Sequence, residues 1–264
     1  MFWKNKNKES GNDTGSIYYD NFALTDTGIV RDHNEDSIAV VRNIDGNGGL
    51  LAIVADGMGG HAGGEVASKM AVDIIATYLK KSTKIKEATL NQAISFANKA
   101  IYEHAQKESR LKGMGTTVVM LYIRKGEALW ANVGDSRLYA VSSESISQIS
   151  IDDVFKDSTT GKNHILTQAC GTKPSVEVHS GSMKLDINNH PLQFMLCSDG
   201  LYDLINDLEI RKILGINKIS LSTEILMGLA KERGGHDNIS IVTIEASPSL
   251  PEKTTQEIKI SHEG

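Results

Sequence analysis

The chain is expected to fold as an α+β protein in which antiparallel sheets pack on each other and helices lie outside them. About nine or ten β-type runs occur along the 264 residues, and the helical patterns come in pairs instead of alternating with strands. A doubly wound parallel sheet needs a helix after almost every strand, so this pairing disfavours it. The length allows one large domain or two small ones.

The N-terminal part is predicted to be a flexible start followed by strands. Residues 1–16 are polar and expected to be flexible, whereas residues 17–24 and 37–44 have the composition of strands. Residues 45–49, Asp-Gly-Asn-Gly-Gly, carry the turn chemistry of a β-hairpin. The six apolar residues 50–55 then predict a buried strand.

The same hairpin loop begins like a calcium-binding loop, with Asp45 and Asn47 at its first and third positions. Residues 51–55 would then occupy the seventh to eleventh positions, where a calcium loop leads into a helix. Those residues are predicted to form a strand, so the sequence favours the hairpin over the calcium site.

Two amphipathic helices and two β-rich runs follow. The apolar positions of the helices are Val66, Met70, Ile74 and Tyr78 in the first, and Leu90, Ala93, Ile94, Ala97, Ala100 and Ile101 in the second. The β-rich runs are residues 116–123 and 128–141, joined by a turn at 124–127. Gly134 and Asp135 lie midway along the second run, where such a pair indicates a bulge or the close approach of a ligand.

The last part of the chain is expected to be less regular before a final strand. Residues 142–163 are polar, weakly patterned and expected at the surface. The remaining elements are short structured pieces at 165–170 and 175–178, an apolar strand at 192–197, helices at 201–214 and 223–233, and a strand at 239–244. Residues 247–264 are rich in charges and predict a flexible tail, so the catalytic domain is expected to span residues 17–246.

The composition is that of an ordinary globular protein, with 40% hydrophobic and 23% charged residues. The net charge is −5, and no basic stripe suits a nucleic acid. The N-terminus lacks the apolar core of a secretory signal, and no apolar run approaches the roughly 18 residues of a membrane span. We therefore expect a cytoplasmic protein without nucleic-acid or membrane partners. Cys197 lies in an apolar run, where a buried reduced thiol is expected.

Three carboxylates stand at glycine-rich junctions beside predicted strands. Asp56 follows the 50–55 strand and precedes five glycines in eight residues, Asp199 repeats the arrangement after 192–197, and Asp237 precedes the final strand. Further candidates are Glu35, Asp36 and Asp135. Each junction alone could be a tight turn. If several of these acids converge, however, cations must offset their mutual repulsion.

Oxygen ligands without a His or Cys spacing favour Mg²⁺ or Mn²⁺ over zinc. Two such ions about 3.5–4 Å apart, bridged by one carboxylate, would hold and deprotonate a water molecule for in-line attack on a phosphate ester. Arg31 provides a guanidinium fork for the phosphoryl oxygens. His61 lies in the same glycine-rich loop as Asp56 and is a candidate acid for the leaving group.

Seven motifs carry a resemblance that covers roughly residues 17–246. They are VRDHNEDS at 30–37, ADGMGGH at 55–61 with Gly64 and Glu65, MGTT at 114–117, VGDSRLY at 133–139, LTQACG at 166–171, SDGL at 198–201 and GGHDNI at 234–239. Present together and in this order, they resemble the metal-dependent protein phosphatase family (type 2C) in its compact bacterial form.

The resemblance implies a four-layer αββα fold, a central antiparallel β-sandwich flanked by helix pairs, with the metals at one end. By matching position, Asp56 would bridge two Mn²⁺ or Mg²⁺ ions and Gly57 would lend its carbonyl oxygen. Asp199 and Asp237 would complete the ligands of the first ion. Glu35 would hold a metal-bound water.

The resemblance also implies roles at the edge of this centre. Arg31 would bind the substrate phosphate, and His61 falls where the general acid lies in the family. Asp135, together with Asp199, matches acids that bind a third, looser ion. The resemblance does not decide the role of Asp36, which is expected either to support the metal ligands or only to act as a cap.

The function implied is dephosphorylation of phosphoserine and phosphothreonine in proteins, by direct attack of a hydroxide that bridges the two ions. The partners would be phosphorylated proteins, the targets of a serine/threonine kinase, and the kinase itself. Two alternatives stay open: a non-catalytic module that binds phosphoproteins, and a metallohydrolase of a small phosphorylated metabolite. Residues 142–163 occupy the position of the family's flap beside the substrate groove, and they are shorter than usual.

Overall fold

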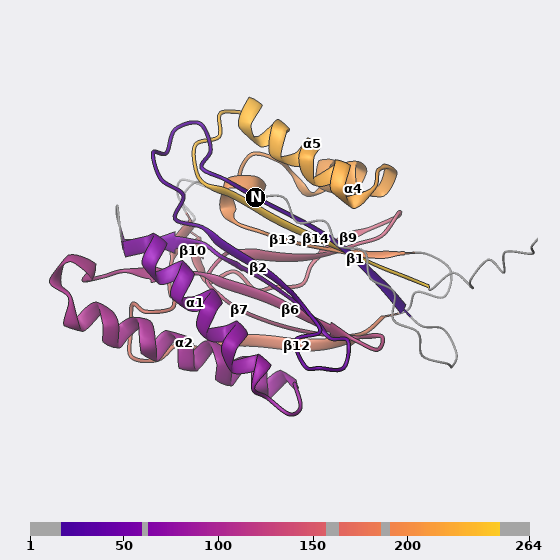
Figure 1. The fold of residues 1–264 in the computed structure, drawn as a ribbon. Coiled ribbons are helices and arrows are strands. Elements are labelled where there is room, and N and C mark those ends of the chain that lie inside the picture. Colours follow the sequence, from indigo (N-terminus) through magenta and orange to yellow (C-terminus); the bar gives the residue numbers. More distant parts are fainter. Residues whose placement is uncertain (1–16, 60–62, 157–163, 186–190, 249–264) are drawn as a thin grey trace, which may run out of the picture.

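The fold is known from a computed structural model, which describes residues 17–59, 63–156, 164–185 and 191–248. Its elements lie in four layers, with two β-sheets in the middle and a pair of helices on each outer side (Figure 1). The predicted antiparallel β-sandwich between helix pairs is therefore confirmed. Within the described ranges, no helix has both the length and the apolar character needed to cross a membrane.

Each large sheet has five strands, and every strand pair in the described residues is antiparallel. One sheet has the order β1-β14-β13-β8-β9 and the other the order β12-β7-β6-β3-β2, while β4-β5 and β10-β11 form two small ladders. The strands are β1 (Ile17–Asp26), β2 (Ser37–Arg42), β3 (Leu50–Ala55), β4 (Gly57–Met58), β5 (Gly115–Thr116), β6 (Val118–Arg124), β7 (Glu127–Val133), β8 (Arg137–Val141), β9 (Ile146–Gln148), β10 (Val154–Lys156), β11 (His164–Leu166), β12 (His179–Lys184), β13 (Leu192–Cys197) and β14 (Ile239–Pro248).

Two helix pairs cover the outer faces of the sandwich (Figure 1). Helices α1 (Gly63–Lys80) and α2 (Glu87–Lys107) lie on the sheet that contains β3, and α4 (Asp207–Ile216) and α5 (Ile219–Glu232) lie on the other. The described residues also include a short 3₁₀-helix, η1 (Ser109–Leu111), and a short α-helix, α3 (Asp199–Tyr202).

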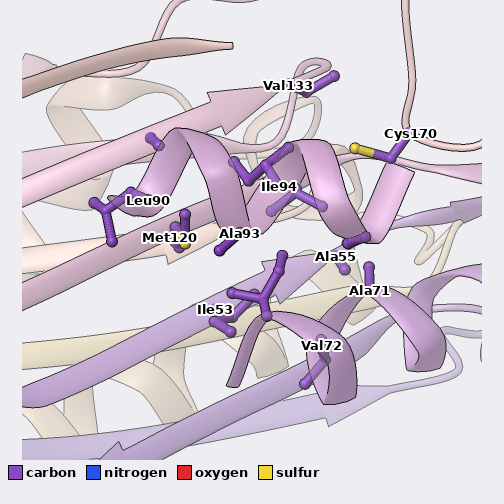
Figure 2. Packing of buried hydrophobic residues seen from close by; sticks show 14 of the residues in the cluster. Ile53, Ala55, Ala71, Val72, Leu90, Ala93, Ile94, Met120, Val133 and Cys170 are labelled. Carbon is purple, nitrogen blue, oxygen red and sulfur yellow. The ribbon is translucent and has the colours of Figure 1, made fainter. Parts of the chain in front are cut away.

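Strand β3 is an uninterrupted apolar run because both of its faces are buried. Successive side chains of a strand point to opposite faces. Leu51, Ile53 and Ala55 pack under the α1–α2 pair. The alternate residues of the strand lie in the cluster between the two sheets. Figure 2 shows the first cluster, where Ile53 and Ala55 meet side chains from α1 and α2.

The segment 128–141 is not one strand with a bulge, as the sequence analysis allowed. It is two strands in different sheets, β7 and β8, and residues 134–136 carry the chain from one sheet to the other. Gly134 has a φ of 94°, and a Cβ there would press against Thr117. Glycine is therefore required at this crossing. The crossing places Asp135 between β7 and β8, at the end of both sheets.

Other boundaries also differ from the predictions. The expected surface segment 142–163 contains β9, which extends a sheet through β8, and β10, which pairs with β11. The expected helix at 201–214 is interrupted because Asn206 caps a new helix, α4, by accepting the Glu209 N–H at 3.1 Å. Strand β12 was missed because its sequence, His-Ser-Gly-Ser-Met-Lys, is polar, and no element forms at 175–178.

Strand β14 is longer than predicted, and it ends two residues beyond the expected domain boundary at 246. Pro248 lies opposite Ile17, so the first and last described residues pair with each other. The predictions for residues 1–16 and for the tail from 249 onward lie outside the described residues.

Replacing Ile53 by Ala should lower the free energy of unfolding by about 2–5 kcal/mol, because the side chain is fully buried between β3 and the helices and the cavity would be only partly refilled. Leu208→Ala is the matched control, since Leu208 is 69% exposed and its truncation should cost less than about 0.5 kcal/mol. Urea unfolding followed by circular dichroism measures both variants. Equal losses would contradict the arrangement of the core.

Candidate metal and phosphate site

A cleft of about 540 Å³ contains most of the acids that the sequence analysis singled out. Its acidic lining residues are Asp32, Glu35, Asp56, Asp135, Asp199 and Asp237. Except for Asp32, which lies in the loop between β1 and β2, each of them lies within two residues of a strand end. The register of the strands therefore decides whether they meet.

In the sheet β12-β7-β6-β3-β2, strands β2 and β3 pair so that Ser37 lies opposite Ala55. Glu35 lies just before β2 and Asp56 directly follows β3, so the two acids come to the same end of the sheet. The fold thus brings together residues that are separated by a whole hairpin.

In the sheet β1-β14-β13-β8-β9, strands β13 and β14 pair so that Cys197 lies opposite Ile241. Asp199 follows β13 and Asp237 precedes β14, so these two acids also emerge side by side. Asp135, on the crossing between the sheets, completes the acidic group.

Two threonines hold the backbone of Asp56. The Thr116 hydroxyl donates to the Asp56 carbonyl oxygen at 2.9 Å, and the Thr117 hydroxyl accepts the Asp56 N–H at 3.0 Å. Thr117 Oγ1 also lies 2.6 Å from Ser136 Oγ, next to Asp135. The sequence analysis did not assign a role to these threonines, although both lie within the MGTT motif.

Asn238 fixes the loop that carries Arg31 and Glu35. Its Oδ1 accepts the Glu35 N–H at 2.8 Å, and its Nδ2 donates to the carbonyl oxygens of Thr27 and His33, each at 2.9 Å. This residue was also missed as a contributor, because its partners are more than 200 positions away in the sequence. Its place directly after Asp237 was the available signal.

The glycine-rich loop after Asp56 packs too closely for side chains. A Cβ on Gly57 would overlap the carbonyl oxygens of Gly64 and Glu35, and a Cβ on Gly64 would overlap Glu35 Oε2. Close backbone approach, the property that glycine supplies, is thus used at both positions. Gly57 lines the cleft, where the sequence analysis expects its carbonyl oxygen to act.

The carboxyl groups are held in a setting that resists ionisation. Burial, followed by repulsion from neighbouring carboxylates, raises the pKa of Asp56 well above its ordinary value. Burial and then the charge of Asp135 raise the pKa of Asp199 to about 7. Burial also raises the pKa of Asp36 to about 6, although hydrogen bonds from Ser240 and Ser198 oppose the shift. Such a group of acids is stabilised by bound cations.

Two buried carboxylate oxygens, Asp36 Oδ1 and Asp199 Oδ1, have no hydrogen-bond partner. Their lone pairs are therefore available to a cation. The donor set, all oxygen, suits Mg²⁺ or Mn²⁺. No group of three or more His, Cys, Asp or Glu side chains in the described ranges is arranged as a metal site by itself.

Asp237 is engaged by Arg31, whose Nη2 donates to Asp237 Oδ2 at 2.6 Å. The Arg31 side chain is half exposed and lines the cleft, so the cation expected to bind phosphate lies beside an expected metal ligand. Asp36 is buried and does not line the cleft, and it accepts a hydrogen bond from the Ser198 hydroxyl at 2.8 Å. His61, the candidate general acid, lies outside the described residues, within 60–62.

The chain belongs to the protein phosphatase 2C family. Residues 30–226, more than half of the chain, match the model of that family. The serine/threonine phosphatase stp of Listeria welshimeri is 33% identical over 240 residues, which cover 84% of this chain and 93% of that protein.

Solved structures agree with this assignment. A bacterial serine phosphatase is similar with a TM-score of 0.80 and 30% identity, over 89% of this chain and 100% of the other. The catalytic domain of the serine/threonine protein phosphatase PstP, in complex with two manganese ions, is similar with a TM-score of 0.78 and 30% identity, over 88% and 100% of the two chains.

In the absence of divalent ions, the Asp199→Asn variant should be more stable than the wild type at high pH. The folded-state pKa of Asp199, about 7, lies above its ordinary value of 3.8, so the folded protein binds this proton more tightly than the unfolded chain. Wild-type stability therefore falls as the pH rises from about 4 to above 7, and the variant escapes this loss. The expected advantage of the variant is roughly 1–3 kcal/mol at about pH 8 and near zero at about pH 4.

Chemical unfolding with a chelator at several pH values measures this difference, and Asp207→Asn, at an exposed position on α4, is the control. Saturating Mn²⁺ should reverse the order, because the wild-type carboxylate then gains a counter-ion. A difference that does not change with pH would show that Asp199 ionises freely in the folded protein.

Proposed function

We propose that this chain removes phosphate from phosphoserine and phosphothreonine in proteins, with Mn²⁺ or Mg²⁺ bound in the cleft. The observation that carries the proposal is the convergence of Asp56, Asp199 and Asp237 in one cleft with the guanidinium of Arg31. These acids come from both sheets of the sandwich. Membership of the protein phosphatase 2C family supports the same reaction.

The proposed metal ligands are side-chain carboxylates and one backbone carbonyl oxygen. When bound, divalent ions supply a nucleophile by lowering the pKa of water, and they offset charge on the phosphoryl oxygens. Asp56 would be a ligand of the ions, since the charges of Asp199 and Asp135 act on its buried carboxyl group and its backbone is fixed by Thr116 and Thr117. The Gly57 carbonyl oxygen, Asp199 and Asp237 would complete the ligand set.

The remaining residues would orient the reactants. Arg31 would release Asp237 and take up the substrate phosphate with its guanidinium fork. Glu35, held by Asn238 through its backbone, would position water, and the buried Asp36 would support the loop from below. His61 would protonate the leaving group.

The number of ions is proposed as two, with a third bound more loosely by Asp135 and Asp199. Asp135 is suited to this role because it lines the cleft and its carbonyl oxygen is fixed by the Tyr202 hydroxyl at 3.0 Å. The relative that contains two manganese ions supports Mn²⁺ as one choice. We propose that either Mn²⁺ or Mg²⁺ serves.

The proposed partners are phosphorylated proteins, among them the targets of a serine/threonine kinase and the kinase itself. Relatives named serine/threonine phosphatases support protein substrates. The cytoplasmic location and the absence of nucleic-acid and membrane partners stay predictions from the sequence.

Hydrolysis of p-nitrophenyl phosphate tests the proposed reaction. The wild type should turn over with Mn²⁺ or Mg²⁺ and stop with a chelator, and Asp199→Asn should lose at least about a hundredfold in kcat because a metal ligand is removed. Asp207→Asn, the same change at an exposed site on α4, should retain the wild-type rate. No turnover by folded protein with any metal would favour the non-catalytic binding module. Faster turnover of phosphorylated metabolites than of phosphopeptides would favour the metabolite hydrolase.

Arg31→Ala should raise KM for a phosphopeptide by about tenfold or more and change kcat less, because the bound phosphate loses a bidentate partner. Arg31→Lys should recover only part of the loss, since an ammonium group cannot form the fork. Steady-state kinetics with saturating Mn²⁺ separates KM from kcat. An unchanged KM in Arg31→Ala would remove Arg31 from phosphate binding.

A further inference from the structure

Three apolar side chains line the otherwise polar cleft: Val30, Met58 and Leu166. Val30 is 61% exposed, Met58 is 38% exposed and Leu166 is partly exposed. We call these three residues the apolar rim. A single exposed apolar side chain needs no explanation, but these three come from distant parts of the chain and line one acidic cleft.

The backbone that carries Val30 is fixed. The N–H groups of Ile29 and Val30 both donate to the carbonyl oxygen of Gly235, at 2.8 and 3.3 Å. A Cβ on Gly28 would overlap the carbonyl oxygen of Asp237, so the loop lies directly against the residues before β14. Val30 is thus exposed by a rigid loop, next to Arg31.

The other two rim residues are fixed by separate contacts. Met58 lies opposite Gly115 in the β4-β5 ladder. Leu166 lies opposite Val154 in the β10-β11 ladder, and the N–H of the next residue, Thr167, donates to the Asp153 carbonyl oxygen at 2.8 Å.

Asp153 in turn ties this ladder to the acidic end of the sandwich. Its Oδ2 accepts the Gly134 N–H at 2.8 Å, and its Oδ1 lies 2.8 Å from His179 Nε2. The position of Leu166 relative to the acids is therefore set by the fold.

We propose that the apolar rim recognises an apolar side chain adjacent to the phosphorylated residue of the substrate. The inference rests on the proposed function and names the substrate class of that site. The rim residues line the same cleft as Arg31 and the acids, and the neighbours of a phosphorylated residue in an extended peptide follow at about 3.3 Å intervals, so they would come within reach of the rim. Contact with an apolar side chain would remove the rim from water, whereas a charged side chain would lose hydration there.

The competing possibility is electrostatic. Asp32 and Glu35 also line the cleft, and they would attract a basic flanking residue. The experiment must therefore compare apolar, basic and acidic neighbours of the same phosphorylated residue.

Three phosphothreonine peptides that differ only in carrying Leu, Lys or Glu on both sides of the phosphothreonine provide this comparison. With wild-type protein and Mn²⁺, we expect kcat/KM to be about tenfold higher for the Leu peptide than for the other two. Val30→Thr preserves shape and replaces a methyl group by a hydroxyl. Leu166→Asn, in the β10-β11 ladder, replaces the two terminal methyl groups by an amide of similar size. The double variant should bring the ratio of the Leu to the Lys peptide close to one.

Ile29→Thr is the matched control, because Ile29 is 62% exposed on the same loop but does not line the cleft. Its peptide preference should equal that of the wild type. Ratios between peptides are compared within each variant, so differences in folding or metal loading cancel.

The proposed role of the apolar rim would be overturned by equal rates on the three peptides or by a preference for Lys. A Leu preference that persists in the double variant would overturn it as well. These outcomes are separate from failure of the proposed function. Absence of turnover on p-nitrophenyl phosphate by the folded wild-type protein would overturn the proposed function and this inference with it.

Discussion

Repulsion among carboxylates at one end of the β-sandwich is the constraint on which the rest of this structure depends. Asp56, Asp135 and Asp199 line one cleft, and burial together with their neighbours raises the pKa of each. In isolation, such a group would separate or bind protons. It stays together because strand register fixes where the chain leaves each sheet, and because cations offset the charge when they bind.

The scaffold opposes this repulsion with apolar packing on one side and hydrogen bonds on the other. All six residues of β3 are buried, so the strand that ends at Asp56 cannot shift without exposing a face of the core. Thr116 and Thr117 then hold the Asp56 backbone, and Asn238 holds the loop of Glu35. The mutually repelling carboxylates therefore lie on backbone segments that are held in place. Functional sites commonly lower the stability of the folded protein in this way.

Arg31, the residue that we propose to bind phosphate, is held next to these acids by one of them. The Arg31 guanidinium pairs with Asp237, which lowers the negative charge facing the cleft. A cation at Asp237 and a phosphate at Arg31 would replace that single pair by two complementary ones. Because the pair is solvent-accessible, the exchange requires little rearrangement of the protein, and the apolar rim beside it can act on the part of the substrate that lies outside the phosphate site.

The sequence by itself determined the strands that end in acids, because β3 and β13 are apolar runs followed by Asp-Gly or Ser-Asp-Gly, and local chemistry is enough to read them. It also indicated the antiparallel class and the two helix pairs. The sequence could not show that 128–141 divides between two sheets, since β7 and β8 have similar composition and only long-range pairing separates them. Nor could it reveal polar β12, the Arg31–Asp237 pair or the bonds of Asn238, which join residues far apart in the chain. Periodicity reports the burial of neighbouring residues, whereas contacts between distant segments are decided by strand register and packing.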